Sequence, residues 1–142
     1  MCGRRLAGTA ACCLLVVALG CSGAQRSGRK PVDIQLTDFH VGLPSTSLSA
    51  GRHVLRVENL GPSTHEIIVD RTDRADGDLP LLGDGLTVNE ESPDLRRVGG
   101  MEVIRLHDTP QLQLDLSPGH YVLYCNLEGH YLGKMHASLD VT

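Results

Sequence analysis

The sequence has few aromatic residues and, beyond its first twenty-one positions, very little cysteine. Aromatic residues make up 3% of the 142 positions and Trp is absent, so Leu, Val and Ile must build the hydrophobic core. Four of the five cysteines, Cys2, Cys12, Cys13 and Cys21, lie in an N-terminal segment with the features of a targeting signal. Only Cys125 is left in the rest of the chain, which excludes a disulfide there.

Residues 1–21 lack an apolar run long enough to cross a membrane, which needs about 20 residues. Arg4 and Arg5 precede an apolar stretch that Gly8 interrupts, as in an export signal. The ending Ala18-Leu19-Gly20-Cys21 resembles a bacterial lipobox. This resemblance implies cleavage before Cys21, lipid attachment to its sulfur, and an exported protein held at the outer side of the cell membrane or in the periplasm. Ordinary secretion is the alternative.

Residues 22–30 contain no apolar periodicity and predict a flexible basic tether. From Pro31 onward the chain has 17 acidic and 8 basic residues, a formal charge of −9. Such an acidic surface makes nucleic acid an unlikely partner. We expect residues 31–142 to form a single domain and to be monomeric.

Short runs rich in Leu, Val and Ile predict strands separated by turns with Gly and Pro. In 112–116, for example, the leucines alternate with polar residues in the period of two typical of half-buried strands. This pattern favours an all-β antiparallel sandwich. The expected strands are 32–36, 53–58, 66–69, 112–116, 121–125 and 136–141.

The segment 70–100 is acidic and irregular. Its aspartates do not have the spacing of an EF-hand loop, so we interpret them as solvated loop residues. Ser92 followed by Pro93 is typical of a helix start and predicts a short helix through Arg97, ended by Gly99-Gly100.

Three soft or borderline metal ligands stand at even intervals near the C-terminus. Cys125, His130 and Met135 are separated by four residues each, with glycines where a loop must curl. In an oxidising compartment a lone cysteine needs an explanation, and metal ligation supplies one. A thiolate, imidazole and thioether select copper over hard cations. A fourth ligand must come from another strand, and His65, just before the apolar run 66–69, is the best candidate.

Together these residues resemble the cupredoxins, the small blue copper proteins. The match in residue type, order and spacing consists of Asn59, Gly61, His65, Pro118, Gly119, Tyr121, Cys125, His130 and Met135. The resemblance implies a cupredoxin-like antiparallel Greek-key β-sandwich, here with a long, partly helical insertion between middle strands. It also implies one copper ion per chain, Cu(I) or Cu(II).

The resemblance further assigns roles. His65 and His130 are the equatorial imidazoles, Cys125 the thiolate and Met135 the axial thioether. His130 is the expected electron port, where redox protein partners meet an apolar patch. The patch candidates are Leu60, Pro62, Leu127, Tyr131 and Leu132.

Many cupredoxins have an Asn after the first histidine, but this chain has Glu66 there and Asn126 after Cys125. We predict that the Glu66 carboxylate accepts a hydrogen bond from Asn126, through its side chain or its backbone N–H. That contact would tie the two ligand loops together.

The remaining histidines form no His-x-His pair, and the chain after the signal lacks the two cysteines of a CuA centre. A catalytic copper enzyme is therefore not expected. Three classes stay open: a single-electron carrier, a copper-holding or copper-delivery protein, and a non-redox β-sandwich module with zinc or no metal. The single Cys and Met135 favour the carrier.

Overall fold

The computed structural model describes residues 29–142. The targeting segment, Cys21 and most of the tether lie outside the described residues. Within them, no helix is long and apolar enough to cross a membrane.

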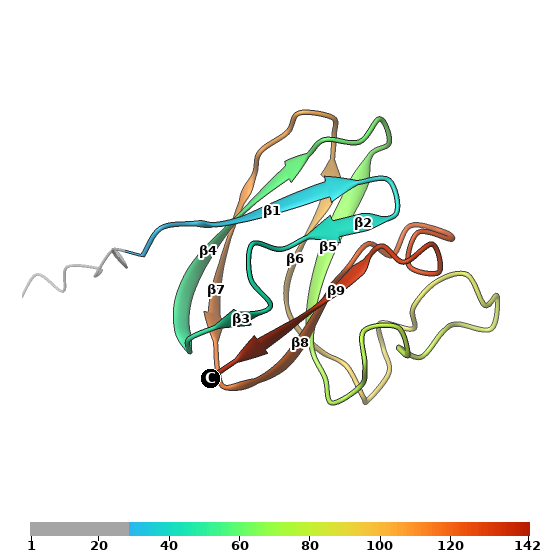
Figure 1. Ribbon diagram of the computed structural model, residues 1–142. Coiled ribbons are helices and arrows are strands. Elements are labelled where there is room, and N and C mark those ends of the chain that lie inside the picture. Colours follow the sequence, from blue (N-terminus) through green and yellow to red (C-terminus); the bar gives the residue numbers. More distant parts are fainter. Residues whose placement is uncertain (1–28) are drawn as a thin grey trace, which may run out of the picture.

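Nine strands form two sheets that pack face to face (Figure 1). One sheet has the order β2-β1-β4-β7 and the other the order β3-β9-β8-β5-β6. The strands are β1 (Val32–Thr37), β2 (His40–Gly42), β3 (Ser47–Leu48), β4 (Gly51–Asn59), β5 (His65–Arg71), β6 (Arg96–Ile104), β7 (Gln111–Leu116), β8 (Gly119–Tyr124) and β9 (His136–Val141).

The prediction of an all-β sandwich is confirmed, but the sheets are mixed rather than purely antiparallel. β1 pairs in parallel with β4, and β3 pairs in parallel with β9. The chain leaves β1 through the short edge strand β2, crosses to the other sheet as β3, and returns as β4 beside β1. This crossover makes β1 and β4 run in the same direction.

The main core lies between the two sheets and consists mostly of the aliphatic residues that alternate along the strands. Ile34 and Leu36 of β1, for example, are buried while their neighbours face outward. Alternation of this kind allows each strand to bury one face. Cys125 and Met135 belong to the same buried cluster, so the ligand candidates lie at one end of the core.

The segment between β5 and β6 contains no helix, and the predicted helix through Arg97 is wrong. Leu79, Val88 and Leu95 of this segment pack against the outer face of the five-stranded sheet in a second buried cluster. Arg97 is already part of β6 and forms an ion pair with buried Asp70 of β5. Tertiary contacts of the side chains thus override the local helix signal.

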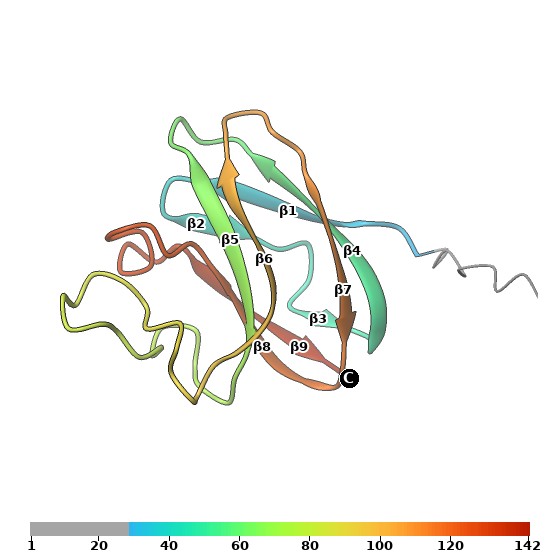
Figure 2. The ribbon, with the colours of Figure 1, turned by 180° about the vertical axis from the view of Figure 1, so that it is seen from behind.

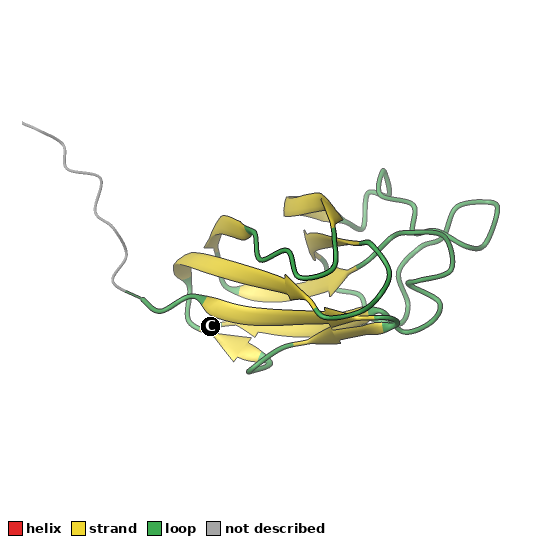
Figure 3. Ribbon diagram, turned by 90° about the horizontal axis from the view of Figure 1, so that it is seen from above, coloured by secondary structure: helices red, strands yellow, loops and turns green. Residues whose placement is uncertain are grey.

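The longest loops gather at one end of the sandwich (Figure 3). The β1–β2 turn and the β8–β9 loop both lie at this end, with the insertion 72–95 looping out beside them (Figures 1 and 2). Segments far apart in sequence can therefore contribute to one site there.

Candidate metal centre

His65 is the first residue of β5, and a hydrogen-bonded turn sets its position. Buried Asn59 accepts a bond from the Gly61 N–H at 3.0 Å and donates to the Ser63 and Ile104 carbonyls, both at 2.8 Å. A Cβ on Gly61 would stand 2.8 Å from an Asp38 carboxylate oxygen, so this turn needs a glycine to approach the β1–β2 turn. The Asn-x-Gly motif thereby places His65 in the core.

Cys125 directly follows β8 and opens a tightly closed loop. Its N–H donates to the Met135 carbonyl at 3.1 Å, and the Met135 N–H donates to the His130 carbonyl at 3.0 Å. Gly129 has φ +78°, which a side chain would oppose. The even spacing in sequence therefore becomes a loop whose ends are held together.

The ligand atoms of His65, Cys125 and His130 all lie within 4.8 Å of one another, the one such group of His, Cys, Asp or Glu among residues 29–142. Cys125 Sγ is 3.4 Å from His130 Nδ1, and the two imidazole centroids are 5.2 Å apart. Metal–N and metal–S bonds of about 2.0–2.3 Å, as found for zinc, would suit a single ion between them.

The donor atoms fit a metal ion chemically as well as by distance. His65 is fully buried, and its Nδ1 has no hydrogen-bond partner while its Nε2 contacts Asp38. Burial lowers the pKa of His65, nearby His130 lowers it further, and Asp38 opposes both effects. A buried neutral imidazole with a free lone pair is the form that binds metal.

Cys125 is fully buried and has no disulfide partner. Burial raises the pKa of its thiol, while the backbone N–H groups of Glu66 and Leu127 lower it and the Glu66 charge raises it. A thiolate at this place needs a cation, and a coordinated metal ion deprotonates a thiol outright.

Met135 is fully buried in the same apolar cluster as Cys125. The loop hydrogen bonds fix its backbone next to both Cys125 and His130. Its place in the core suits a thioether ligand, but its role as the axial ligand stays a prediction.

Glu66 and Asn126 meet between the two ligand loops. The Asn126 N–H donates to Glu66 Oε1 at 2.8 Å, which is one of the two contacts expected from the sequence. The Asn126 side chain turns the other way, donating to Glu90 Oε1 at 2.7 Å and accepting from the Val88 N–H at 2.6 Å. Asn126 thus connects the ligand loops to the insertion.

The apolar patch expected beside half-buried His130 is supported by exposure for only some of its members. Leu60, Leu127 and Leu132 are exposed, whereas Tyr131 is only 4% exposed. Its hydroxyl donates to the Asp76 carbonyl and accepts from the Leu79 N–H, which fixes the insertion instead. The prediction that Tyr131 belongs to the patch is therefore wrong.

Phe39, which sequence reasoning missed, lies beside His130. It is 53% exposed, and its ring centroid is 5.5 Å from that of His130. A lone aromatic residue in a turn was the only signal for it in the sequence.

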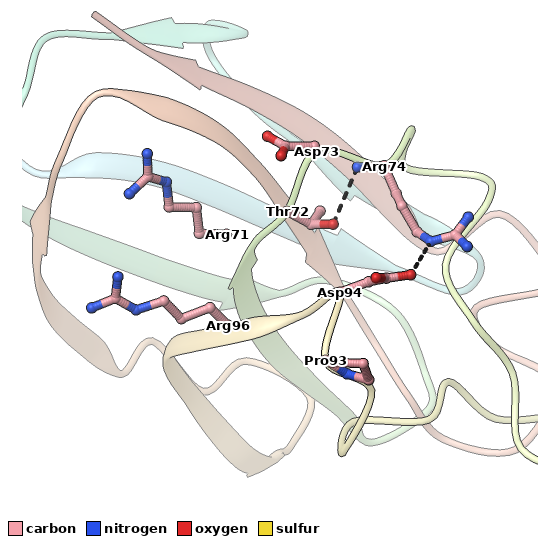
Figure 4. A pocket seen from close by; sticks show the side chains of 7 residues that line it. All are labelled: Arg71, Thr72, Asp73, Arg74, Pro93, Asp94 and Arg96. Atoms are coloured by element: carbon pink, nitrogen blue, oxygen red, sulfur yellow. Dashed lines mark hydrogen bonds and ion pairs between the residues drawn. The ribbon is translucent and has the colours of Figure 1, made fainter.

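The other histidines lie outside the cluster. His136, next to Met135, packs its ring 5.0 Å from Tyr131 and stands 3.2 Å from an Asp76 carboxylate oxygen, away from the ligand atoms. An open pocket at the far end of β5 is lined by Arg71, Thr72, Asp73, Arg74, Pro93, Asp94 and Arg96 (Figure 4). It offers no soft ligands and is not a second copper site.

Comparison with solved structures identifies the fold. An auracyanin from the photosynthetic bacterium Roseiflexus castenholzii superposes with a TM-score of 0.57 at 12% identity, covering 82% of this chain and 99% of that one. Auracyanin A of Chloroflexus aurantiacus, a blue copper protein, gives 0.53 at 19% identity, with 80% and 100% covered. Rusticyanin gives 0.55 at 12% identity, with 78% and 76% covered.

The chain therefore has the cupredoxin fold. Its cluster of His65, Cys125 and His130 supplies imidazole and thiolate donors, the types that a type 1 copper centre uses, and Met135 lies in the same core as Cys125. No family model matches the sequence, and no curated protein is similar to it.

Proposed function

We propose that this protein is a type 1 copper protein that carries single electrons between redox partners as a monomer, through His65, Cys125, His130 and Met135. The observation that carries the proposal is the cluster of His65, a buried free thiol and a second imidazole, whose ligand atoms lie within 4.8 Å of one another while the buried Nδ1 of His65 has no hydrogen-bond partner. A copper ion bound there would supply a one-electron Cu(II)/Cu(I) couple.

The chain's own residues would keep that couple in one geometry. Hydrogen bonds within the 125–135 loop and the Asn59 turn hold the ligand residues without metal. Such preorganisation limits the rearrangement that accompanies a change of charge. His130 is the ligand nearest to solvent, so its ring provides the path to a partner at the apolar surface of Phe39, Leu60, Leu127 and Leu132.

The burial of the ligand residues also favours an electron carrier over a copper-delivery protein. Cys125, His65 and Met135 are each fully buried. Delivery requires an incoming protein to exchange ligands one by one, which is easier at exposed ligands. A carrier needs only electronic contact at the surface.

The visible spectrum of the copper-loaded protein tests the proposal. We expect an intense thiolate-to-Cu(II) charge-transfer band that Cys125→Ser abolishes and His65→Ala weakens, whereas His40→Ala leaves it intact. Met135→Leu should keep the colour and raise the potential, because the thioether stabilises Cu(II). A colourless protein that passes Cu(I) to an acceptor would instead support delivery.

We further propose export and lipid anchoring at Cys21, supported by the sequence of residues 1–21. Mass spectrometry of protein from its native host should find a diacylglyceryl group on an N-terminal Cys21. An unmodified N-terminus downstream of Cys21, or a Cys21→Ser protein that still partitions with membranes, would contradict the anchor.

A further inference from the structure

The turn between β1 and β2 touches both histidines of the candidate centre, although neither of its residues is itself a ligand. Asp38 Oδ1 lies 3.1 Å from His65 Nε2, and the Phe39 ring packs against His130. One two-residue turn thus reaches the ligand that opens β5 and the ligand in the β8–β9 loop.

Asp38 is held in place from several sides. The Ser63 hydroxyl donates to its Oδ2 at 3.1 Å and the Ser63 N–H donates to its Oδ1 at 3.4 Å. Gly61 lies directly against it, since a Cβ there would stand 2.8 Å from Oδ1 and 2.9 Å from the Asp38 nitrogen. The carboxylate is therefore directed at His65 by the same turn that positions that histidine.

Phe39 shows that this arrangement is imposed by packing. It has φ 62°, a left-handed conformation that is an outlier for a bulky residue. A Cβ on Gly133 would collide with its ring. Such backbone strain persists only where the surroundings over-determine it, so the turn is clamped between the ligand loops.

The hydrogen bond to Asp38 has a chemical consequence for His65. A carboxylate accepts only, so Nε2 must carry the proton and donate it. Nδ1 then keeps its lone pair free for a metal ion, and it is the buried ring atom without a hydrogen-bond partner. A carboxylate behind a metal-binding histidine fixes its tautomer and ring orientation and raises its basicity.

We propose that Asp38 is a positioning residue of the metal centre, whose carboxylate fixes the Nε2–H form of His65 and favours Cu(II) over Cu(I) by its negative charge. The second half rests on the proposed copper function, and the first half does not. With copper bound there, Asp38 would change only the relative stability of the ion's two charge states and would not itself take part in the electron transfer.

The first half is tested in metal-free protein by NMR of the His65 ring. In the wild type we expect an Nε2–H proton protected from exchange with water. Asp38→Ala should make this proton exchange at least tenfold faster, while Asp115→Ala, which removes an exposed carboxylate on β7, should not. Equal exchange in wild type and Asp38→Ala would overturn the proposal.

The second half is tested by redox titration of copper-loaded Asp38→Asn, which removes the charge with little change in shape. At the wild-type midpoint potential we expect the Cu(I):Cu(II) ratio to rise about tenfold, equivalent to about 59 mV for one electron. Cu(II) affinity should fall about 10- to 100-fold. Asp38→Glu, which restores the charge, should move the ratio back toward wild type.

Asp115→Asn is the matched control for a general charge effect. Equal shifts in Asp38→Asn and Asp115→Asn would mean that Asp38 acts only as one more distant charge, and the tuning role would be wrong. A protein that binds no copper would refute the proposed function, and the NMR experiment on the metal-free protein would still decide the hydrogen bond.

Discussion

Glu66, the residue after His65, connects the two ligand loops by its contacts with Cys125 and Asn126. Its backbone N–H lowers the pKa of the Cys125 thiol, and its carboxylate accepts the Asn126 N–H. Burial raises the pKa of the Glu66 carboxyl, which the Asn126 hydrogen bond opposes. This half-buried carboxylate, close to the thiol, would add negative charge near a bound metal ion.

Glu66→Gln should keep copper and colour but raise the reduction potential. The glutamine oxygen can still accept the Asn126 N–H, so the loops stay connected, while the negative charge that favours Cu(II) is lost. A charge about 7 Å from the ion contributes about 2 kcal/mol at an effective dielectric of 20, before screening. Redox titration measures the shift. Glu91→Gln, in the exposed part of the insertion, is the control, and equal potentials in Glu66→Gln and wild type would exclude a role for Glu66.

Val103 adopts φ 55° and is 54% exposed. A β-branched residue in the left-handed region is strained, because Cβ crowds the following carbonyl at about 1–2 kcal/mol. Val103→Asn should therefore stabilise the protein by about 1 kcal/mol in urea denaturation, since Asn tolerates this conformation. Val103→Ala, which removes the same methyl groups but keeps the strain, should not stabilise. A gain in both variants would point to lost surface hydrophobicity instead.

At the scale of single residues, the sequence was most informative where ligands share one loop. The even spacing of Cys125, His130 and Met135 in the sequence is enough to predict that they lie close together in one loop. Asp38 and Phe39 do not, because Asp38 meets His65 across 27 residues and only after the sheets have packed. A negatively charged or aromatic neighbour that meets the ligands only in the folded structure leaves no local pattern in the sequence.

Among the secondary-structure elements, the sequence identified the six strands with clear apolar alternation and missed β2, β3 and β6. The first two are very short edge strands. β6 begins with two arginines and contains Gly99-Gly100, and most of its side chains are exposed or half-buried. Its place in the sheet comes from pairing with β5, which local propensity does not reveal.

Gly99 is necessary because β6 lies close to the opposite sheet. A Cβ at this position would stand 2.5 Å from Leu114 Cδ2 of β7. Overpacking of this kind costs about 1–3 kcal/mol, so Gly99→Ala should lower the free energy of unfolding by that amount. Chemical denaturation of the metal-free protein measures it. Gly83→Ala, with nothing within 4 Å, is the control. Equal stabilities would show that Leu114 can move aside without cost.

The insertion is fastened to the sheet through Glu90, whose carboxylate accepts hydrogen bonds from Arg97 at 2.7 Å and from Asn126 at 2.7 Å. Burial alone would raise the pKa of Glu90, but these bonds outweigh it and the pKa lies below 4.5. The ionised form is thus favoured by folding. Its stabilisation is present above pH 4.5 and is lost as the pH falls through the lower folded-state value.

Glu90→Gln should therefore reduce the loss of stability on acidification. We expect the wild type to be the more stable protein at pH 7 and the difference to shrink by pH 3–4. Urea denaturation of the metal-free proteins at both pH values measures it. Glu91→Gln, without these partners, should show no such convergence. A Glu90→Gln protein whose deficit is the same at both pH values would exclude the carboxylate as the anchor.

Over the whole molecule, negative charge is concentrated near the candidate metal centre. The domain is strongly acidic, and seven of its acidic residues lie in the insertion 72–95 beside the site, against one arginine there. A net negative surface speeds encounter with positively charged partners, and this effect falls with ionic strength. The apolar surface around His130 would then make the close contact.

If electrons leave through His130, charges near that ring should matter more than equal charges elsewhere. Glu128 is exposed and two residues from His130, whereas Asp115 is exposed near the end of β7 in the other sheet. We expect Glu128→Gln to slow oxidation of the reduced copper protein by a small cationic complex, such as a cobalt(III) phenanthroline, about two- to threefold at low salt. Asp115→Asn should change it less. An anionic oxidant such as ferricyanide should show the opposite sign with Glu128→Gln, because attraction becomes repulsion. Stopped-flow rates over a range of salt concentrations measure both, and equal effects of the two variants would place the electron path elsewhere on the surface.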